Sequence, residues 1–461
     1  MDRKLPPQYA RAFKDADIRG VNVTEIDDDL AYQVARAFVD EFGWQQVVVG
    51  YDMRISSPAL VEAFMRGVED AGADVLSVGL VTSPMLYYVS GSEQLPGVMV
   101  TASHSGPEYN GLKLVMPGAV PLTKSTGLSA IEKRIKRGEF AEPARRGRRR
   151  AKNYHAAFAK YVLSGIKKAD LKDISIVTDV GNGMASVLMP LIERALPLKI
   201  ETLFTDMDAR FPNRGSDPTI VKHQKALKAA VVAGGHDFGI AFDGDADRIA
   251  FVDERGEYVN CAIIGALIAE HLLKTNPGAG MVFTNLTSRV YEEAIKQAGG
   301  KPIRARVGHA FLKRKLLETG ALFGAEHSGH FFFKEFYNTD STVLTLRYVL
   351  AVYAEAKRAG KTFSELVAPY RRYAQLEDVV VDVNDKTASL KKVEAYIAQQ
   401  WPEAKIKYFD GLYVTLPDAW GAVKASVTEH ALKVMFEGRQ KKAAKQVQDQ
   451  LVAYIKTIAK E

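Results

Sequence analysis

The chain has 461 residues, enough for about three domains of ordinary size. Apolar residues make up 47% and charged residues 25%, as in soluble globular proteins, and the single cysteine, Cys261, excludes an intramolecular disulfide and a four-cysteine zinc site. Lysine and arginine number 62 against 55 aspartates and glutamates, and the net charge of +7 favours acidic partners: nucleic acid, anionic membranes or phosphorylated small molecules.

The N-terminal segment MDRKLPPQYA lacks the apolar stretch of a secretory signal, and no run reaches the ~18 apolar residues of a membrane span. A lone cysteine also suits a reducing compartment. We therefore expect a cytoplasmic protein that has no membrane partner.

The first part of the chain alternates between strand-like and helix-like segments. A buried strand is predicted at 47–52, followed by a helix that begins near Ser56 with a proline in its first turn. A second strand at 75–81 precedes a helix that begins at Ser83, and a third strand follows. Strands that alternate with helices indicate a mainly parallel sheet covered by helices.

Changes of composition divide the rest of the chain. Pro143 and the run RRGRRR interrupt the apolar periodicity, and the strand-and-helix pattern then restarts at Ile174 and again near Gly256. Short strands mixed with helices in the last segment indicate an α+β domain with an antiparallel sheet. We interpret RRGRRR as a solvated linker, and we expect four domains at 1–150, 151–255, 256–368 and 369–461.

The segment FDGDADR, residues 242–248, carries three aspartates at alternate positions directly after an apolar strand. In extended backbone Asp243, Asp245 and Asp247 would point to one side, where their repulsion calls for a cation. Such oxygen ligands suit Mg²⁺, and Arg248 could hold a phosphate oxygen. The alternative is a solvated acidic hairpin, because RIAFVDERG is typical of a returning strand, but the full pattern favours a metal site.

A second polar segment, TASHSGPEYNGLK, lies where a strand ends, at residues 101–113. Ser103 would stand at the C-terminal edge of a sheet, where α/β proteins place reactive groups, although an ordinary strand-to-helix turn is the plainer explanation of this segment alone. Lys113 could relay a proton or be a surface charge. Because Ser103 and His104 are adjacent in sequence, their side chains need not meet, and no Ser–His catalytic pair is implied.

Two further segments carry groups suited to a phosphorylated sugar. In GAEHSGH, Glu326, Ser328 and His330 alternate, so an extended strand would present a carboxylate, a hydroxyl and an imidazole to sugar hydroxyls; a polar edge strand is the alternative. KASVTEH, residues 424–430, could form an anion-binding nest, although by itself a plain loop explains it better.

Taken together, these segments occur in the order and at the spacing found in the α-D-phosphohexomutases. The chain resembles the phosphomannomutase/phosphoglucomutase branch of that family nearly from end to end. TASHSGPEYNGLK is similar to the family's phosphoserine loop, FDGDADR matches its metal loop, GAEHSGH resembles its sugar loop, and KASVTEH resembles its phosphate loop. FKDADIRG, GYDMRISSP, FPNRGSDP and VGHAFLK also resemble family segments.

The resemblance implies three related mixed α/β domains and a smaller α+β C-terminal domain around a central cleft. It implies an enzyme that interconverts hexose 1-phosphates and 6-phosphates, of mannose or glucose, through a phosphoserine and a hexose 1,6-bisphosphate, which is also the activator. Ser103 would carry the phosphoryl group and would bind Mg²⁺ together with Asp243, Asp245 and Asp247.

The resemblance also assigns the remaining roles. The catalytic residues would be Ser103, Arg19, Lys113, Arg248 and His330. The substrate-binding residues would be His309, Glu326, Ser328, Lys424, Ser426, Val427 through its N–H, and Thr428. A bisphosphate that turns over while bound needs a closable cleft, so we expect the last domain to move as a lid. We expect a phosphosugar substrate, no nucleic acid, and a monomer or weak dimer.

The chain also departs from the family pattern inside these segments. The differences are Ala16 for a cleft tyrosine, Ser105 and Gly106 for an Asn-Pro pair, Asn285 for a lysine, Lys424 for an arginine, Val427 for asparagine or glycine, and His430 for proline. We expect a looser reactive loop and, because lysine lacks the bidentate fork of arginine, a weaker grip on phosphate. His430 or Arg439 could offset part of that loss.

Three other functions stay open at this point. A phosphoglucosamine mutase would share these motifs, and His327, between Glu326 and Ser328, decides little between the sugars. A Mg²⁺-dependent phosphatase or a non-mutating sugar-phosphate binder would result if the altered phosphate loop released the bisphosphate. Nucleic-acid binding through RRGRRR is disfavoured, because the run lacks interleaved aromatic residues and a recognition fold.

Overall fold

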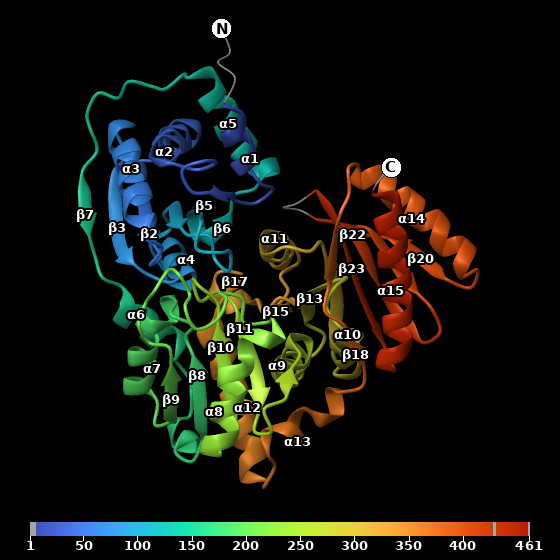
Figure 1. The fold of residues 1–461 in the computed structure, drawn as a ribbon. Helices are drawn as coiled ribbons and strands as arrows, with labels where there is room; N and C mark the ends of the chain where they lie inside the picture. Colours follow the sequence, from blue (N-terminus) through green and yellow to red (C-terminus); the bar gives the residue numbers. More distant parts are fainter. Residues whose placement is uncertain (1–5, 427–429, 460–461) are drawn as a thin grey trace.

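The computed structural model describes residues 6–426 and 430–459, which form four sheets that follow one another along the chain (Figure 1). The predicted fold class, three α/β domains and an α+β domain, is confirmed. We number these domains I to IV in chain order. None of the helices in the described ranges combines the length and the apolar character that a membrane crossing needs.

Domain I has a mixed sheet in the order β1-β5-β4-β2-β3-β7, with β6 paired to β5. The part from β4 to β7 is parallel, whereas β5 runs antiparallel to both of its neighbours. The strands are β1 (Ile18–Val21), β2 (Gln46–Tyr51), β3 (Asp74–Leu80), β4 (Gly97–Val100), β5 (Tyr109–Met116), β6 (Val120–Pro121) and β7 (Arg149–Ala151). The helices are α1 (Pro7–Ala12), α2 (Asp28–Phe42), α3 (Ser57–Asp70), α4 (Ser83–Glu93) and α5 (Leu128–Arg137).

The helix starts predicted in domain I are confirmed. Helix α3 has Pro58 in its first turn, and Thr82 caps α4 by accepting a hydrogen bond from the Met85 N–H. The prediction did not include α2, whose N-terminus Asp27 caps by accepting from the Leu30 N–H.

The basic run RRGRRR is more than a solvated linker. Its last residues form β7, which pairs with β3 at the edge of the sheet. Arg149 forms ion pairs with Glu62 and Glu69, and Arg145 with Asp74. The run is largely exposed, as predicted, but carboxylates of domain I neutralise part of its charge.

Domains II and III each combine three parallel strands with an antiparallel hairpin. Their sheets have the orders β12-β11-β10-β8-β9 and β14-β13-β15-β16-β17. The strands of domain II are β8 (Ser175–Asp179), β9 (Lys199–Leu203), β10 (Phe238–Phe242), β11 (Ile249–Asp253) and β12 (Tyr258–Val259). Those of domain III are β13 (Gly280–Thr284), β14 (Lys301–Ala305), β15 (Phe323–Ala325), β16 (Phe331–Phe333) and β17 (Thr339–Asp340). The helices are α6 (His155–Val162), α7 (Met189–Ala195), α8 (Lys225–Gly234), α9 (Cys261–Thr275), α10 (Arg289–Gln297), α11 (His309–Thr319), α12 (Thr342–Arg358) and α13 (Phe363–Val367).

Domain IV is an antiparallel sheet with two long helices against it (Figure 1). Its strands are β18 (Ala374–Gln375), β19 (Val379–Asp382), β20 (Lys405–Tyr408), β21 (Leu412–Thr415), β22 (Ala419–Ala425) and β23 (Ala431–Gly438), and its helices are α14 (Lys386–Gln400) and α15 (Lys441–Ile458). The prediction did not include β22, so Lys424 lies on a strand and not in a loop.

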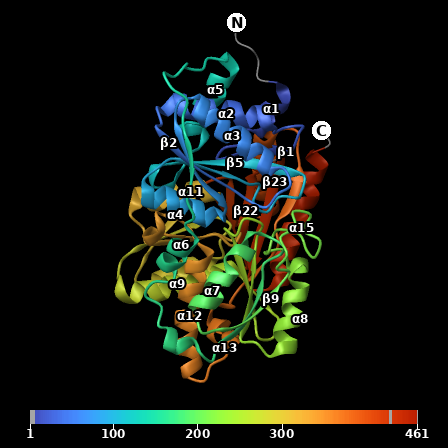
Figure 2. The same cartoon turned by 90° about the vertical axis from the view of Figure 1, so that its left-hand side faces the viewer.

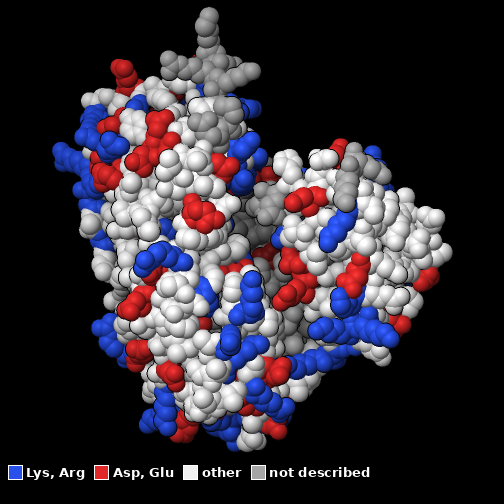
Figure 3. Space-filling view, viewed as in Figure 1, with Lys and Arg blue, Asp and Glu red and all other residues white. Residues whose placement is uncertain are grey.

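One apolar core joins domains I, II and III, whereas domain IV has a core of its own. The shared core contains Met85 of α4, Phe158 of α6, Phe238 of β10 and Phe323 of β15. The core of domain IV is built within residues 376–459. Figure 2 shows domain I above domains II and III, and in Figure 3 the molecule is hollowed between domain IV and the rest.

Candidate active site

The three aspartates of FDGDADR lie in the tight turn between β10 and β11, and not in the extended backbone that their alternation predicted. Ala246 has a positive φ of 59°, and Thr342 donates a hydrogen bond to its carbonyl at 3.0 Å. The carboxylates nevertheless converge, with one oxygen of each within 4.8 Å of the others. The segment is therefore both a hairpin and an acidic cluster, but the cluster is buried and not solvated.

Because the three carboxylates of this cluster are buried, they need positive charge close by. Burial, followed by the charges of Asp247 and Asp245, raises the pKa of Asp243 well above its usual range. Burial also acts to raise the pKa of Asp247, but the positive charges of Lys113 and Arg248 outweigh it and hold that pKa well below its usual range. Buried carboxylates this close repel one another when ionised, and a cation among them would relieve that repulsion.

The donors at this position fit a hard divalent cation. Asp245 Oδ1 is buried and has no hydrogen-bond partner in residues 6–426 and 430–459. The other oxygen of this carboxylate, Asp245 Oδ2, lies 2.7 Å from Lys113 Nζ, which is also 2.6 Å from Asp247 Oδ2. Carboxylate oxygens beside a serine hydroxyl are ligands that Mg²⁺ prefers.

Ser103 follows β4 in a loop that leads to the antiparallel strand β5, and not to a helix. The residue has a φ of 51°, and its N–H donates to Thr101 Oγ1 at 2.9 Å. Its hydroxyl lies 3.0 Å from Asp243 Oδ2 and 3.4 Å from Asp247 Oδ1. The structure thus brings together the serine and the acidic cluster, which lie on two different domains.

The side chain of His104 lies near that of Ser103, although their adjacency in the sequence did not require it. Its Nδ1 is 3.4 Å from Ser103 Oγ. Burial, followed by the nearby charges of Arg248 and Arg19, lowers the pKa of His104 well below its usual range. A neutral imidazole therefore lies beside the serine at neutral pH.

A buried arginine that the sequence analysis did not single out holds the serine loop. Arg54 is 1% exposed, and its side chain lies 3.2 Å from the Asp52 carboxylate. Its guanidinium donates hydrogen bonds of 2.6 to 2.9 Å to the carbonyl oxygens of Ser103, Ser105, Gly106 and Tyr109. Arg54 therefore ties this loop down through four carbonyl oxygens, and the looser loop expected from Ser105 and Gly106 stays a prediction. The sequence signal for Arg54 is the segment GYDMRISSP, which contains it and resembles a family segment.

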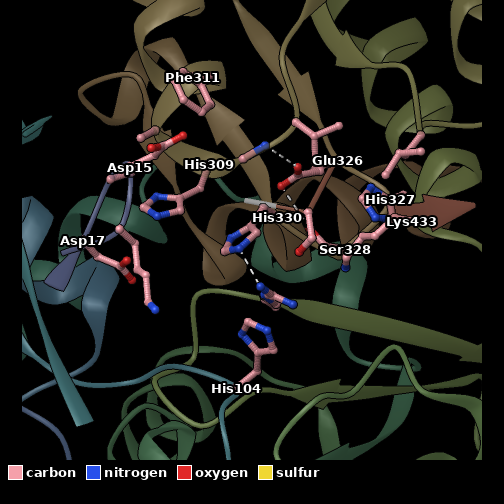
Figure 4. Close-up of a pocket in the computed structure, with 18 of the residues that line it drawn as sticks. Asp15, Asp17, His104, His309, Phe311, Glu326, His327, Ser328, His330 and Lys433 are labelled. Carbon is pink, nitrogen blue, oxygen red and sulfur yellow. Dashed lines mark hydrogen bonds between the residues drawn. The ribbon is translucent and has the colours of Figure 1, made fainter. Parts of the chain in front are cut away.

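A cavity of about 300 Å³ lies next to these groups, and all four domains line it (Figure 4). In Figure 4 the labelled His104 of domain I faces His330, Ser328 and Glu326 of domain III. The polar residues of the lining include Asp17, Arg19 and His104 of domain I, Asp217 and Arg248 of domain II, His309, Glu326, Ser328 and His330 of domain III, and Lys424, Ser426 and Lys433 of domain IV.

Domain III supplies a polar wall through the turn between β15 and β16, where the sequence predicted an extended strand. Glu326 accepts hydrogen bonds from the Gly308 N–H and the Ser328 hydroxyl, both at 3.0 Å. The Arg248 Nε–H donates to His330 Nε2 at 3.0 Å, along the dashed line at His330 in Figure 4. His309 lies at the start of α11, with its ring centre 5.9 Å from that of His330.

Domain IV contributes Lys424 and Ser426, whereas Val427 and Thr428 lie outside the described residues. Lys424 Nζ donates to Asp410 Oδ2 at 2.6 Å, and the same oxygen accepts from the Val307 N–H at 2.9 Å. Burial lowers the pKa of Lys424, although the Asp410 carboxylate acts to raise it. Asp410 therefore links the lysine of the phosphate loop to domain III.

The residues that depart from the family pattern are accounted for in different ways. Ala16 lines the cavity, and Ser105 accepts a hydrogen bond of 3.2 Å from Arg19, which also pairs with Asp17 at 2.6 Å. Asn285 donates to the Phe409 carbonyl and so lies in the contact between domains III and IV. His430 and Arg439, either of which could offset part of the weaker phosphate binding, are not among the described residues that line the cavity.

Family models match nearly the whole chain. They are described as phosphoglucomutase/phosphomannomutase, alpha/beta/alpha domains I, II and III, at residues 10–142, 152–256 and 261–373, and as the C-terminal domain of the same family at residues 379–453.

Relatives from bacteria are similar over almost their full length. A Pseudomonas aeruginosa protein named phosphomannomutase/phosphoglucomutase is 33% identical over 440 residues, which cover 94% of this chain and 93% of the relative. A Neisseria gonorrhoeae protein named phosphoglucomutase is 31% identical over 452 residues, 96% of each chain. A Xanthomonas campestris protein described as phosphohexose mutases is 31% identical over 430 residues, 93% of this chain and 95% of the relative.

Solved structures share the architecture. A phosphoglucomutase/phosphomannomutase family protein from Burkholderia thailandensis superposes with a TM-score of 0.87 at 30% identity and covers 99% of both chains. The open form of the phosphoglucomutase parafusin from Paramecium has a TM-score of 0.75 over 98% of this chain and 95% of its own, and at 17% identity it shows the fold alone.

Proposed function

Because the chain belongs to the phosphoglucomutase/phosphomannomutase family and is thus a phosphohexomutase, an intramolecular phosphotransferase, we propose that it interconverts the 1-phosphates and 6-phosphates of mannose or glucose through phosphorylated Ser103. One observation carries this proposal. The Ser103 hydroxyl lies 3.0 Å from Asp243 in the acidic cluster, next to a cavity that four domains line.

In the proposed first step, the phosphoryl group passes from Ser103 to a hydroxyl of the bound hexose monophosphate. The bond from phosphorus to the serine oxygen breaks, and a bond from phosphorus to the substrate oxygen forms. The substrate hydroxyl gives its proton to a base and the departing serine oxygen takes up one proton, so no proton is gained or lost overall. The products are free Ser103 and a hexose 1,6-bisphosphate. After the bisphosphate turns over, transfer of its other phosphoryl group back to Ser103 gives the isomer.

Mg²⁺ is the metal that we propose for the acidic cluster, held by Asp243, Asp245, Asp247 and the Ser103 oxygen. When bound, it would neutralise the charge on the transferring phosphoryl group. Lys113 supplies further positive charge. Although burial opposes it, the carboxylates of Asp245 and Asp247 raise the pKa of Lys113 well above its usual range, so this ammonium stays charged. We therefore assign Lys113 as a fixed counter-charge and not as a proton acceptor.

His330 is the base that we propose. Arginine side chains stay protonated, so Arg19 and Arg248 are suited to holding phosphate oxygens and not to accepting a proton. His330 presents an accepting nitrogen, Nε2, which meets the Arg248 Nε–H at the cavity wall. A neutral imidazole at this position has the acceptor that general-base catalysis needs.

The substrate would lie between domains III and IV. Glu326 and Ser328 would read two sugar hydroxyls, His309 would contact the sugar, and Lys424 and Ser426 would hold the phosphate that does not react, together with Val427 and Thr428. Because domain IV has a core of its own, we propose that it moves as the lid. Activation by hexose 1,6-bisphosphate and a monomeric or weakly dimeric state also belong to this proposal.

The test is an assay of the purified protein with Mg²⁺, a trace of hexose 1,6-bisphosphate, and the 1-phosphate of mannose, glucose or glucosamine in turn. Formation of the 6-phosphate supports the proposal and ranks the sugars. Ser103→Ala should abolish turnover and phosphorylation, whereas Ser105→Ala should still be phosphorylated at Ser103. Release of inorganic phosphate without isomer would instead support the phosphatase.

A further inference from the structure

A buried ion pair lies behind His330, and the mechanism above does not use it. Asp340 ends β17 and Lys313 belongs to α11, and both are almost fully buried. Lys313 Nζ lies 3.2 Å from Asp340 Oδ2 and 3.8 Å from the ring centre of Tyr87, which comes from domain I. Burying two charges costs free energy, so a buried ion pair next to the active site suggests that it has a role there.

The contacts of His330 fix where its proton lies. The Arg248 Nε–H can only donate, so His330 Nε2, at 3.0 Å from it, must accept. A neutral imidazole that accepts at Nε2 carries its proton on Nδ1. Nδ1 lies 3.3 Å from Asp340 Oδ2 and, farther off, 3.8 Å from Asp247 Oδ1.

Of the two carboxylates that face Nδ1, Asp340 lies nearer to this proton. In the described parts of the chain, neither His330 Nδ1 nor either Asp340 oxygen has a hydrogen-bond partner, so the 3.3 Å approach of Nδ1 to Oδ2 is a close charge contact and not a formed hydrogen bond. If the proton were on Nε2 instead, the Nδ1 lone pair would face the Asp340 carboxylate. The Nε2–H of His330 would then also point at the Nε–H of Arg248, so two donors would face each other. Both repulsions disfavour that tautomer in a buried site.

We propose that Asp340 is a positioning residue that holds His330 as its Nδ1–H tautomer, so that the Nε2 lone pair faces the cavity. A substrate phosphate that draws Arg248 toward itself then leaves Nε2 free to accept the hydroxyl proton of the sugar. Lys313 balances the charge of Asp340, so that the carboxylate that orients the imidazole is not an unpaired buried charge. This inference rests on the proposed function, in which His330 is the base.

The test combines kinetics with a direct reading of the tautomer. Asp340→Asn keeps the shape of the side chain, but its amide can donate to Nδ1 and so favour the wrong tautomer. We expect kcat to fall on the order of 10²-fold with KM nearly unchanged. Asp253→Asn is the matched control, because Asp253 is also a buried aspartate paired with a basic side chain, that of Arg371, but is not among the residues that line the cavity. It should keep the kcat of the unmodified protein.

The tautomer is read from ¹⁵N NMR of histidine-labelled protein, which has nine histidines, with the His330 signal assigned by its loss in His330→Gln. We expect a protonated Nδ1 and an unprotonated Nε2 in the unmodified protein, and a shift toward Nε2–H in Asp340→Asn. If Asp340→Asn does not fold, the spectrum of the unmodified protein still decides, because an Nε2–H signal for His330 would overturn the proposal. Full kcat in Asp340→Asn would overturn it as well.

Failure of this inference can be told apart from failure of the proposed function. If the unmodified protein made no hexose 6-phosphate, the proposed function would fail, and with it the catalytic part of this inference, whatever the spectrum showed. If the protein were an active mutase and His330→Gln kept full activity, only the role of His330 and Asp340 would fail.

Discussion

The two sides of the cavity are built by different means. On the side of Ser103, the groups are buried and fixed by several partners each: Arg54 holds the carbonyls of the serine loop, and Lys113 binds two of the three aspartates. On the side of the phosphate loop, Lys424 belongs to a domain with its own core and is tied to domain III through Asp410. Phosphoryl transfer is faster when the surrounding charges are held in fixed positions. The release and turning of a bisphosphate instead require that one wall of the cavity, here domain IV, can move.

We call the side of the cavity that carries Ser103 the fixed side and the side that carries Lys424 the movable side. The largest effect is expected from a substitution in the acidic cluster of the fixed side. Asp245→Ala removes a carboxylate that also holds Lys113 and the Ser83 hydroxyl. We expect kcat to fall on the order of 10³-fold, because the weakened site would no longer hold the Mg²⁺ that neutralises the charge on the phosphoryl group. Activity assays and calorimetric titration with Mg²⁺ would measure the loss.

Asp206→Ala, at an exposed position outside the cavity lining, is the control for this change and should bind Mg²⁺ as before. If Asp245→Ala bound Mg²⁺ with unchanged affinity, the assignment of the metal to this cluster would be wrong.

Arg54→Lys should give the next largest effect, because an ammonium cannot reproduce the planar fork that reaches several carbonyls at once. We expect the serine loop to shift and kcat to fall by about 10²-fold, in line with the cost of small misplacements in catalysis. The free energy of unfolding should fall by about 3 kcal/mol, since hydrogen bonds to a buried charge are lost. Kinetics and thermal denaturation would test both, with the partly exposed Arg36→Lys as control; an unchanged kcat would contradict the role of Arg54.

The contrast between the two sides also explains what could be predicted from sequence. Helix starts at Ser57 and Ser83 were predictable because proline and capping residues act locally. The convergence of the aspartates was predicted for a wrong reason, since the alternation came from a tight turn with Ala246 at positive φ. Period-two spacing has the same appearance in a strand and in a functional turn.

Other features had no local signal. Arg54 binds backbone carbonyls, which every residue has, so no pattern of side chains announces its partners. Lys313 and Asp340 pair only because α11 and β17 pack together within domain III. The ties within the fixed side are thus products of tertiary structure, whereas the reactive groups themselves could be recognised from their motifs.

Lys424→Met should weaken substrate binding on the movable side and leave the rate of phosphoryl transfer unchanged. We expect KM for the hexose phosphate to rise by about tenfold, the loss of one charged contact of about 1.4 kcal/mol, with kcat and Ser103 phosphorylation nearly unchanged. Steady-state kinetics would separate the two constants, and Lys445→Met, an exposed lysine on α15, serves as control. A fall in kcat with constant KM would show that the phosphate side shares in the chemistry.

Lys424→Arg should give the smallest effect and sharpens the comparison most. Arginine would restore the family's bidentate fork while Asp410 can still accept from it. If the lysine is a weakened version of the family's grip, KM should fall by about threefold at constant kcat. A rise in KM would mean instead that the position next to Asp410 and Val307 has adapted to the smaller ammonium, and that the movable side, too, depends on fixed packing.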